Sequence, residues 1–181
     1  MKRMRVTVVP ALVIGIVTGA AAVLGGSAVF AAKKPAAPPD FSGDKKAVAE
    51  RLLVEAEKLA GTGSWERIGV GRVRYLMGDK AGGERLFNSV LQAKPVPSDL
   101  RRIAATYAAA GEWAKAKEFY ERAHKEKPTD GGISVEAGAW CNLKGDRARA
   151  EELFAGAFTE DPNDFWNHVV AAGSYVGVEP F

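Results

Sequence analysis

The sequence predicts an all-α fold in which pairs of helices repeat along the chain and stack into a right-handed solenoid. A glycine followed by an acidic residue recurs at spacings of 33 and 34 residues: Gly78, Gly111 and Gly145. Prolines recur at the same two spacings: Pro95, Pro128 and Pro162. Each glycine lies between two segments with the apolar periodicity of a helix, and each proline follows the second segment, where it ends a helix. A fixed period of this length predicts stacked repeat units.

The first 31 residues are typical of a secretory signal. Three basic residues lie within the first five positions, an apolar stretch covers 11–24, and small residues lead to Ala31, after which we expect cleavage. The alternative is an uncleaved membrane anchor, because no charge interrupts residues 6–32 and about 20 apolar residues span a bilayer. Both readings predict that the repeats lie outside the cytoplasm. A cleaved chain is periplasmic or secreted, whereas an uncleaved chain is anchored to the membrane. The composition favours a bacterial source.

Charge and cysteine content exclude several classes of protein. The chain carries 25 Lys plus Arg and 22 Asp plus Glu, but three of the basic residues lie in the first five positions, so the remainder is balanced. A neutral chain cannot rely on neutralising phosphates, and we therefore expect no nucleic-acid partner. One cysteine excludes an internal disulfide framework and a zinc site built on paired cysteines. Residues 32–43 are rich in proline and alanine and are expected to form a linker.

Side-chain sizes also repeat with the same period. Small residues recur at the middle of each first helix: Gly71, Ala104, Gly138 and Ala172. In each second helix an aromatic residue follows a small one by four positions: Gly83 and Phe87, Ala116 and Tyr120, Ala150 and Phe154. This pattern resembles the tetratricopeptide repeat (TPR) family, whose unit of about 34 residues is a pair of antiparallel helices. The resemblance implies an N-terminal flanking helix at 44–63. Within residues 64–181 it implies three repeats, at 64–96, 97–130 and 131–164, and a C-terminal capping helix at 165–177.

Two parts of this arrangement carry further expectations. The first unit departs from the family, because Arg67 and Arg74 occupy slots that are usually apolar and Gly82 and Gly83 open its second helix. Such a unit is either adapted for binding or a degenerate terminal repeat. The capping helix is expected to cover the last open face of the stack and to present a polar outer side.

In the family, the first helices line a concave groove that commonly takes a peptide or a partner's helix. Residue by residue, the resemblance implies these groove positions: Trp65, Ile68, Arg72, Leu76, Arg101, Ala105, Ala108, Val135, Ala139, Asn142, Trp166 and Val169. Further slots fall on Met77, Ser98, Ala109, Gly132, Leu143 and Gly173. Such a groove is mainly apolar with two arginines, and suits an apolar or weakly acidic segment. For Ile68, Leu76 and Leu143, we favour ordinary packing between helices over contact with a ligand, because apolar residues at helical spacing usually belong to a core.

Catalytic groups do not assemble in the sequence. Cys141 is expected to be a buried, inert thiol, because it falls where the two helices of a unit pack. His124 and His168 have no second ligand at metal-binding spacing, so no metal or other cofactor is predicted. We therefore expect a non-enzymatic adaptor that binds a protein or peptide partner. The alternative is a self-associating structural protein of the cell envelope, which implies a homo-oligomer.

Overall fold

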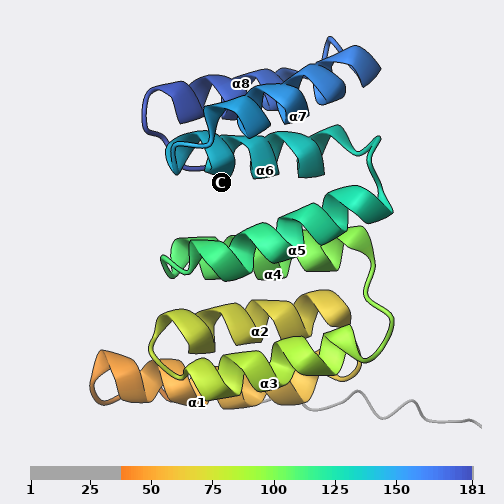
Figure 1. Ribbon diagram of the computed structural model, residues 1–181. Coiled ribbons are helices and arrows are strands. Elements are labelled where there is room, and N and C mark those ends of the chain that lie inside the picture. Colours follow the sequence, from red (N-terminus) through yellow and green to blue (C-terminus); the bar gives the residue numbers. More distant parts are fainter. Residues whose placement is uncertain (1–37, 181) are drawn as a thin grey trace, which may run out of the picture. The chain divides into compact units, whose positions relative to one another are not determined.

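The computed structural model describes residues 38–180, which form eight α-helices and no β-strand (Figure 1). The bounds of the helices are α1 Lys45–Ala60, α2 Ser64–Leu76, α3 Lys80–Leu91, α4 Pro97–Ala109, α5 Trp113–Glu126, α6 Gly131–Leu143, α7 Arg147–Glu160 and α8 Phe165–Tyr175. The predicted all-α class is confirmed. The expected signal segment, 1–31, and the first part of the expected linker lie outside the described residues.

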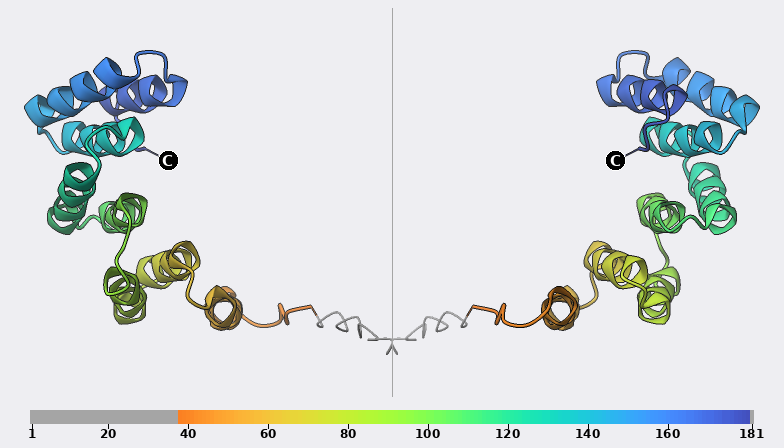
Figure 2. Two further views of the ribbon diagram at one scale, coloured as in Figure 1. Left: turned by 90° about the vertical axis from the view of Figure 1, so that its right-hand side faces the viewer. Right: turned by 90° about the vertical axis from the view of Figure 1, so that its left-hand side faces the viewer.

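The helices form antiparallel pairs that stack one on another. α2 packs on α3, α4 on α5, and α6 on α7, while α1 packs on α2 and α8 packs mainly on α6. Figure 2 shows these helices along an arc, with α2, α4, α6 and α8 nearer its concave side and α3, α5 and α7 on the outside. The arrangement is that of an α-solenoid, in which each unit contacts only its neighbours.

The repeated glycines form the turns inside each pair. Gly78, Gly111 and Gly145 adopt φ values of +104°, +77° and +87°, a region that side chains other than glycine rarely enter. At the start of most helices an aspartate accepts hydrogen bonds from the free backbone N–H groups. These caps are Asp44, Asp79, Asp130, Asp146 and Asp164.

In the first and third pairs, the small residue of one helix packs against the aromatic ring of the other, as the repeat pattern predicted. A Cβ atom added to Gly71 would lie 2.7 Å from the ring of Phe87, and one added to Gly138 would lie 2.7 Å from the ring of Phe154. The rings therefore occupy the space that a side chain at either glycine would need. Most of the buried apolar residues of the three pairs belong to one continuous core.

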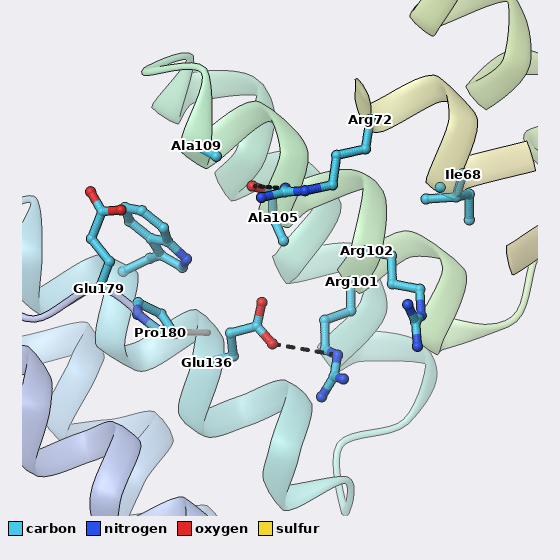
Figure 3. A pocket seen from close by; sticks show the side chains of 11 residues that line it. Ile68, Arg72, Arg101, Arg102, Ala105, Ala109, Glu136, Glu179 and Pro180 are labelled. Atoms are coloured by element: carbon cyan, nitrogen blue, oxygen red, sulfur yellow. Dashed lines mark hydrogen bonds and ion pairs between the residues drawn. The ribbon is translucent and has the colours of Figure 1, made fainter. Parts of the chain in front are cut away.

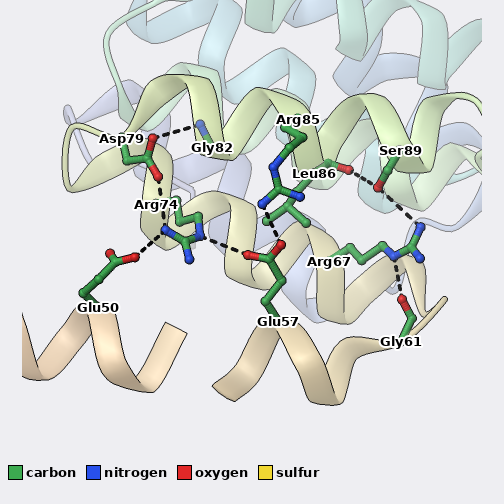
Figure 4. Close-up of polar contacts among 10 residues, drawn as sticks. All are labelled: Glu50, Glu57, Gly61, Arg67, Arg74, Asp79, Gly82, Arg85, Leu86 and Ser89. Carbon is green, nitrogen blue, oxygen red and sulfur yellow. Dashed lines mark hydrogen bonds and ion pairs between the residues drawn. The ribbon is translucent and has the colours of Figure 1, made fainter. Parts of the chain in front are cut away.

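The first unit folds as a helix pair in spite of its unusual residues. Arg74 is buried, with 8% of its surface exposed, and its guanidinium group pairs with Glu50 and Glu57 of α1 and with Asp79 (Figure 4). Arg67 donates from Nε to the carbonyl oxygen of Gly61 at 2.8 Å. An arginine at an apolar slot is accommodated because α1 supplies the carboxylates that neutralise it.

The expectation of a polar outer side for the capping helix is wrong. α8 buries Asn167, Ala171 and Ser174 against α6, whereas Phe165 of the helix and Val176 directly after it are 66% and 77% exposed. α8 has the pattern of a first helix, so the positions against which a second helix would pack stay apolar. The described chain places no helix on that side.

Candidate functional site

The inner helices α2, α4 and α6 surround a cavity of about 430 Å³ on the concave side (Figure 3). It is partly open, and eleven residues line it: Ile68, Gly69, Arg72, Arg101, Arg102, Ala105, Ala109, Glu136, Trp140, Glu179 and Pro180. A second cavity of about 160 Å³ adjoins it between α4, α6 and α8. We call the two together the concave site.

Helical spacing places the lining side chains. Arg101, Ala105 and Ala109 follow one another at four-residue intervals, so they share one face of α4. Glu136 and Trp140 share one face of α6 for the same reason. Because Ala105 and Ala109 are small, they leave space between the helices, and the longer arginine side chains surround this space.

Glu136 is the carboxylate at the centre of the site. It accepts a hydrogen bond from the hydroxyl group of Tyr120 at 2.7 Å, and Nε of Arg101 lies 3.4 Å from its other oxygen. Burial raises the pKa of the Glu136 carboxyl, while the charge of Arg101 opposes the shift. Its side chain is only 15% exposed, so Glu136 serves as an internal counter-ion that orients Arg101.

The other two arginines of the site lack a carboxylate partner. Arg72 donates to the backbone oxygen of Ala105 at 3.5 Å, and the guanidinium group of Arg102 lies 3.6 Å from the ring centre of Trp65. No carboxylate oxygen of residues 38–180 lies within 4.0 Å of the guanidinium nitrogens of Arg72 or Arg102. The stack on Trp65 fixes the plane of Arg102 without neutralising its charge.

Two buried N–H groups of the lining are also unsatisfied. Nε of Arg102 and Nε1 of Trp140 have no hydrogen-bond acceptor among the described residues. Buried donors are almost always paired in folded proteins, with protein, water or ligand. The lining thus offers more hydrogen-bond donors and positive charge than its own acceptors satisfy.

Two of the further slots, Ala109 and Gly132, line the concave site, and so do six of the twelve groove positions given first. Four of them line the larger cavity: Ile68, Arg72, Arg101 and Ala105. The smaller cavity is lined by Arg101 with Val135 and Trp166. Three further predicted residues, Trp65, Leu76 and Val169, are exposed but line neither of these cavities.

Three predicted groove residues lie elsewhere. Ala108 and Ala139 are 4% and 0% exposed and belong to the core between units, so they do not face the groove. Asn142 donates to the hydroxyl oxygen of Ser174 at 3.1 Å and joins α6 to α8. In α6 the residues that line the larger cavity, Glu136 and Trp140, lie one position after the predicted Val135 and Ala139, so Ala139 was assigned one residue out of register. In α4 the predicted Arg101 and Ala105 do line it, and Ala108 lies on another face of the helix.

Several residues of the site were not predicted from the sequence: Arg102, Glu136, Trp140, Glu179 and Pro180. A four-residue step from Gly132, which was assigned to a groove slot, leads to Glu136 and Trp140 and was an available signal. No periodic signal marks Glu179 or Pro180, because they follow the last helix.

Cys141 and the two histidines lie outside the concave site. Cys141 is buried, as predicted, and burial raises the pKa of its thiol to about 11. His124 bonds to Ser134 at 3.0 Å, and His168 lies against Phe158. Within residues 38–180, no group of three His, Cys, Asp or Glu side chains could hold a metal ion. No helix of that part of the chain is long and apolar enough to cross a membrane.

Comparison with known proteins supports the fold. One solved structure, described as "YrrB: a TPR protein with an unusual peptide-binding site", superposes on this chain with a TM-score of 0.50 at 17% sequence identity. The match covers 71% of this chain and 68% of that chain. No protein-family model matches the sequence, and no curated protein matches it. The described chain therefore has the fold of an α-solenoid built of tetratricopeptide-like helix pairs.

Proposed function

We propose that the chain is a non-catalytic scaffold whose concave site binds a protein segment that carries a carboxylate next to apolar residues. The observation that carries the proposal is the imbalance of charge in the larger cavity. Three guanidinium groups and two carboxylates line it: Glu136 pairs with Arg101 and also accepts a hydrogen bond from Tyr120, whereas Glu179 pairs with none of the three arginines. Charge-assisted bonds from arginine to carboxylate are the contacts that such a lining can add.

A protein segment fits this site better than a small metabolite. The cavity is partly open and continues toward α8, so it can hold part of a chain whose remainder lies along the groove. A solved protein of the same fold is described as having a peptide-binding site, which supports peptide as the first class of ligand to test.

The test is selection of random peptides on the full-length chain, followed by affinity measurement with variants. We expect the selected peptides to be rich in Asp or Glu beside apolar residues. Arg72→Glu should weaken their binding by about tenfold or more, because a lost charge-assisted hydrogen bond is worth about 1.5–3 kcal/mol. The matched control is Arg85→Glu, an exposed arginine of α3 that pairs with Glu57 outside the site.

Circular dichroism checks that both variants keep their helices. Equal binding to Arg72→Glu and the unaltered chain would place the ligand elsewhere and contradict the proposal.

We also propose that the chain is exported, on the basis of the signal-like pattern in residues 1–31. Fractionation of cells and the intact mass of the chain test this proposal. Cleavage predicts a chain that begins at Ala32 in the periplasm or the medium. An uncleaved anchor predicts the full mass in the membrane fraction, and the full mass in the cytoplasm would contradict export.

A second candidate function is self-association, favoured by the exposed apolar side of α8. Phe165, Trp166 and Val176 are each at least 60% exposed, and a second copy is one occupant that would cover them. Sedimentation of the full-length chain over a range of concentrations tests it. A mass that rises with concentration, and falls in Phe165→Ser with Val176→Ser, would support a homo-oligomer, whereas a constant monomer mass would contradict it.

A further inference from the structure

The segment after α8 turns back onto the concave side of the solenoid (Figure 2). Gly177 has a φ of +83°, and the N–H groups of Val176 and Val178 both donate to the carbonyl oxygen of Gly173, at 3.0 and 2.9 Å. A glycine in this conformation ends a helix and reverses the chain. A Cβ atom at Gly173 would lie 3.4 Å from the side chain of Val178, so the valine packs on the bare helix surface.

This turn directs the next two residues into the concave site. Glu179 and Pro180 line the larger cavity, and Pro180 also lines the smaller one. Three residues are common to both cavities: Arg101, Glu136 and Pro180. Arg101 and Glu136 are paired on neighbouring helices, whereas Pro180 reaches this wall from a segment outside the helices (Figure 3).

We propose that residues 178–180 are an intramolecular placeholder in one continuous docking groove, which runs from Ile68 on α2 to Trp166 on α8, and that the partner is an extended acidic segment that displaces them. The proposal rests on the proposed function and adds to it the path of the partner and a competitor within the chain. Withdrawal of Pro180 would remove one of the three residues that line both cavities.

The contacts of the segment suit a placeholder. Within the described part of the chain, no hydrogen bond or ion pair holds Glu179 or Pro180 in the cavity. Figure 3 shows the carboxylate of Glu179 directed away from Arg72 and Arg101. The segment therefore covers the site without pairing with the arginines. A partner whose carboxylates reach these arginines gains interactions that the segment lacks.

The partner's form follows from the segment that it replaces. Residues 178–180 have no helical structure; Glu179 and Pro180 line the cavity, whereas Val178 lies beside Gly173 of α8. An occupant of the same path is extended, and it is acidic because two guanidinium groups of the site have no carboxylate partner.

The experiment locks the segment in place reversibly. Ala109 and Glu179 are both exposed and both line the larger cavity, so Ala109→Cys with Glu179→Cys in the full-length chain gives a pair for a short methanethiosulfonate crosslinker that dithiothreitol releases. Cys141 stays in place because it is buried. The probe is a fluorescein-labelled peptide of four glutamates, with four glutamines as its control, and binding is read by fluorescence polarisation.

We expect efficient crosslinking and a locked chain that binds the acidic probe more weakly than the released chain. If the segment is docked nine-tenths of the time, releasing it entirely, by changing Val178, Glu179 and Pro180 together to glycine, raises the apparent affinity about tenfold. Single-cysteine variants capped with methyl methanethiosulfonate control for modification of the site itself.

The outcomes separate this inference from the proposed function. Crosslinking no better than that of a distant pair, Ala109→Cys with Thr159→Cys, would show that the segment does not dock. Equal probe binding by the locked and released chains would overturn its role as a competitor. A chain that crosslinks efficiently but binds the probe in neither state would support docking of the segment and contradict the acidic partner.

Discussion

The guanidinium group of Arg74 lies between α1, α2 and α3 with 9% of its side chain exposed. Two of its carboxylate partners, Glu50 and Glu57, lie on α1 and the third, Asp79, caps α3; all three are 27–46% exposed. A charge this deep is tolerated only where its partners remain in place. Arg74 therefore makes the flanking helix a structural part of the first unit.

Replacing Arg74 by methionine should destabilise the fold by about 2 kcal/mol, between the values for exposed and fully buried ion pairs. Methionine keeps much of the packing but leaves three carboxylates close together without a cation. Chemical denaturation measures the loss. The matched variant is Arg85→Met, whose exposed arginine shares Glu57, and it should cost less than about 1 kcal/mol. Equal losses for the two variants would show that the buried cluster contributes no more than a surface pair.

At the scale of the helix pair, glycine has two opposite roles. Gly138 lies where α6 and α7 approach, and an added Cβ would be 2.7 Å from Phe154. Gly156 lies in the exposed part of α7, and an added Cβ would meet nothing within 4 Å. The first position is fixed by packing, whereas the second only gives the unfolded chain more conformational freedom.

Alanine at these two glycines should therefore change stability in opposite directions. Gly138→Ala should destabilise by about 1–3 kcal/mol because Phe154 must move. Gly156→Ala should stabilise by about 0.5–1 kcal/mol because alanine is the better helix former. Urea denaturation of both variants checks the signs, and a loss of stability on both substitutions would contradict the account of Gly156.

Neighbouring helix pairs are joined by polar contacts as well as by the core. Glu112, before α5, accepts hydrogen bonds from the hydroxyl group of Tyr75 in α2 at 2.8 Å and from Lys80 at 2.6 Å. The hydrogen bond from Lys80, followed by that from Tyr75, lowers the pKa of the Glu112 carboxyl to about 2. The first and second units are thus linked by a carboxylate that must be ionised.

This link predicts a dependence of stability on pH. Because the pKa of Glu112 is lower in the folded chain than in the unfolded chain, its stabilising effect is complete above the unfolded value of about 4.3 and is lost as pH falls toward 2. The unaltered chain should be more stable than Glu112→Gln at pH 6, and the difference should shrink below pH 4. Thermal denaturation at several pH values measures it, with Glu126→Gln in an exposed pair as the control. A difference that stays constant with pH would contradict the assignment.

The elements that the sequence predicts well are those with a periodic physical cause. Gly78 and its two counterparts recur because a turn with positive φ is needed once in every unit, and Phe87 faces Gly71 because helices must approach closely at one point. The concave site was predicted less well. A shift of one residue turns a helix by about 100°, enough to exchange Ala139 for Trp140. Pro180 depends on a single turn that has no repeated signal.

At the scale of the whole molecule, position along the stack decides how many neighbours support each helix. α4 packs against α2, α5 and α6, whereas α1 packs mainly on α2, with a smaller contact to α3. Leu53 of α1 belongs to a small cluster with Val70 and Leu86, separate from the main core. In a solenoid, stability is approximately a sum of terms within units and between neighbours, so an end helix has fewer of them.

Hydrogen exchange should therefore be graded from the ends of the described stack toward its centre. We expect backbone amides in α1 to exchange at least about tenfold faster than those in α4, which corresponds to an opening free energy lower by about 1.4 kcal/mol. Leu53→Ala should raise exchange in α1 and leave α6 unchanged, because α1 can separate while the main core stays folded. Exchange followed by mass spectrometry measures each helix separately. If Leu53→Ala accelerated α6 as much as α1, the solenoid would open as a single cooperative unit, and α1 would be part of its common core.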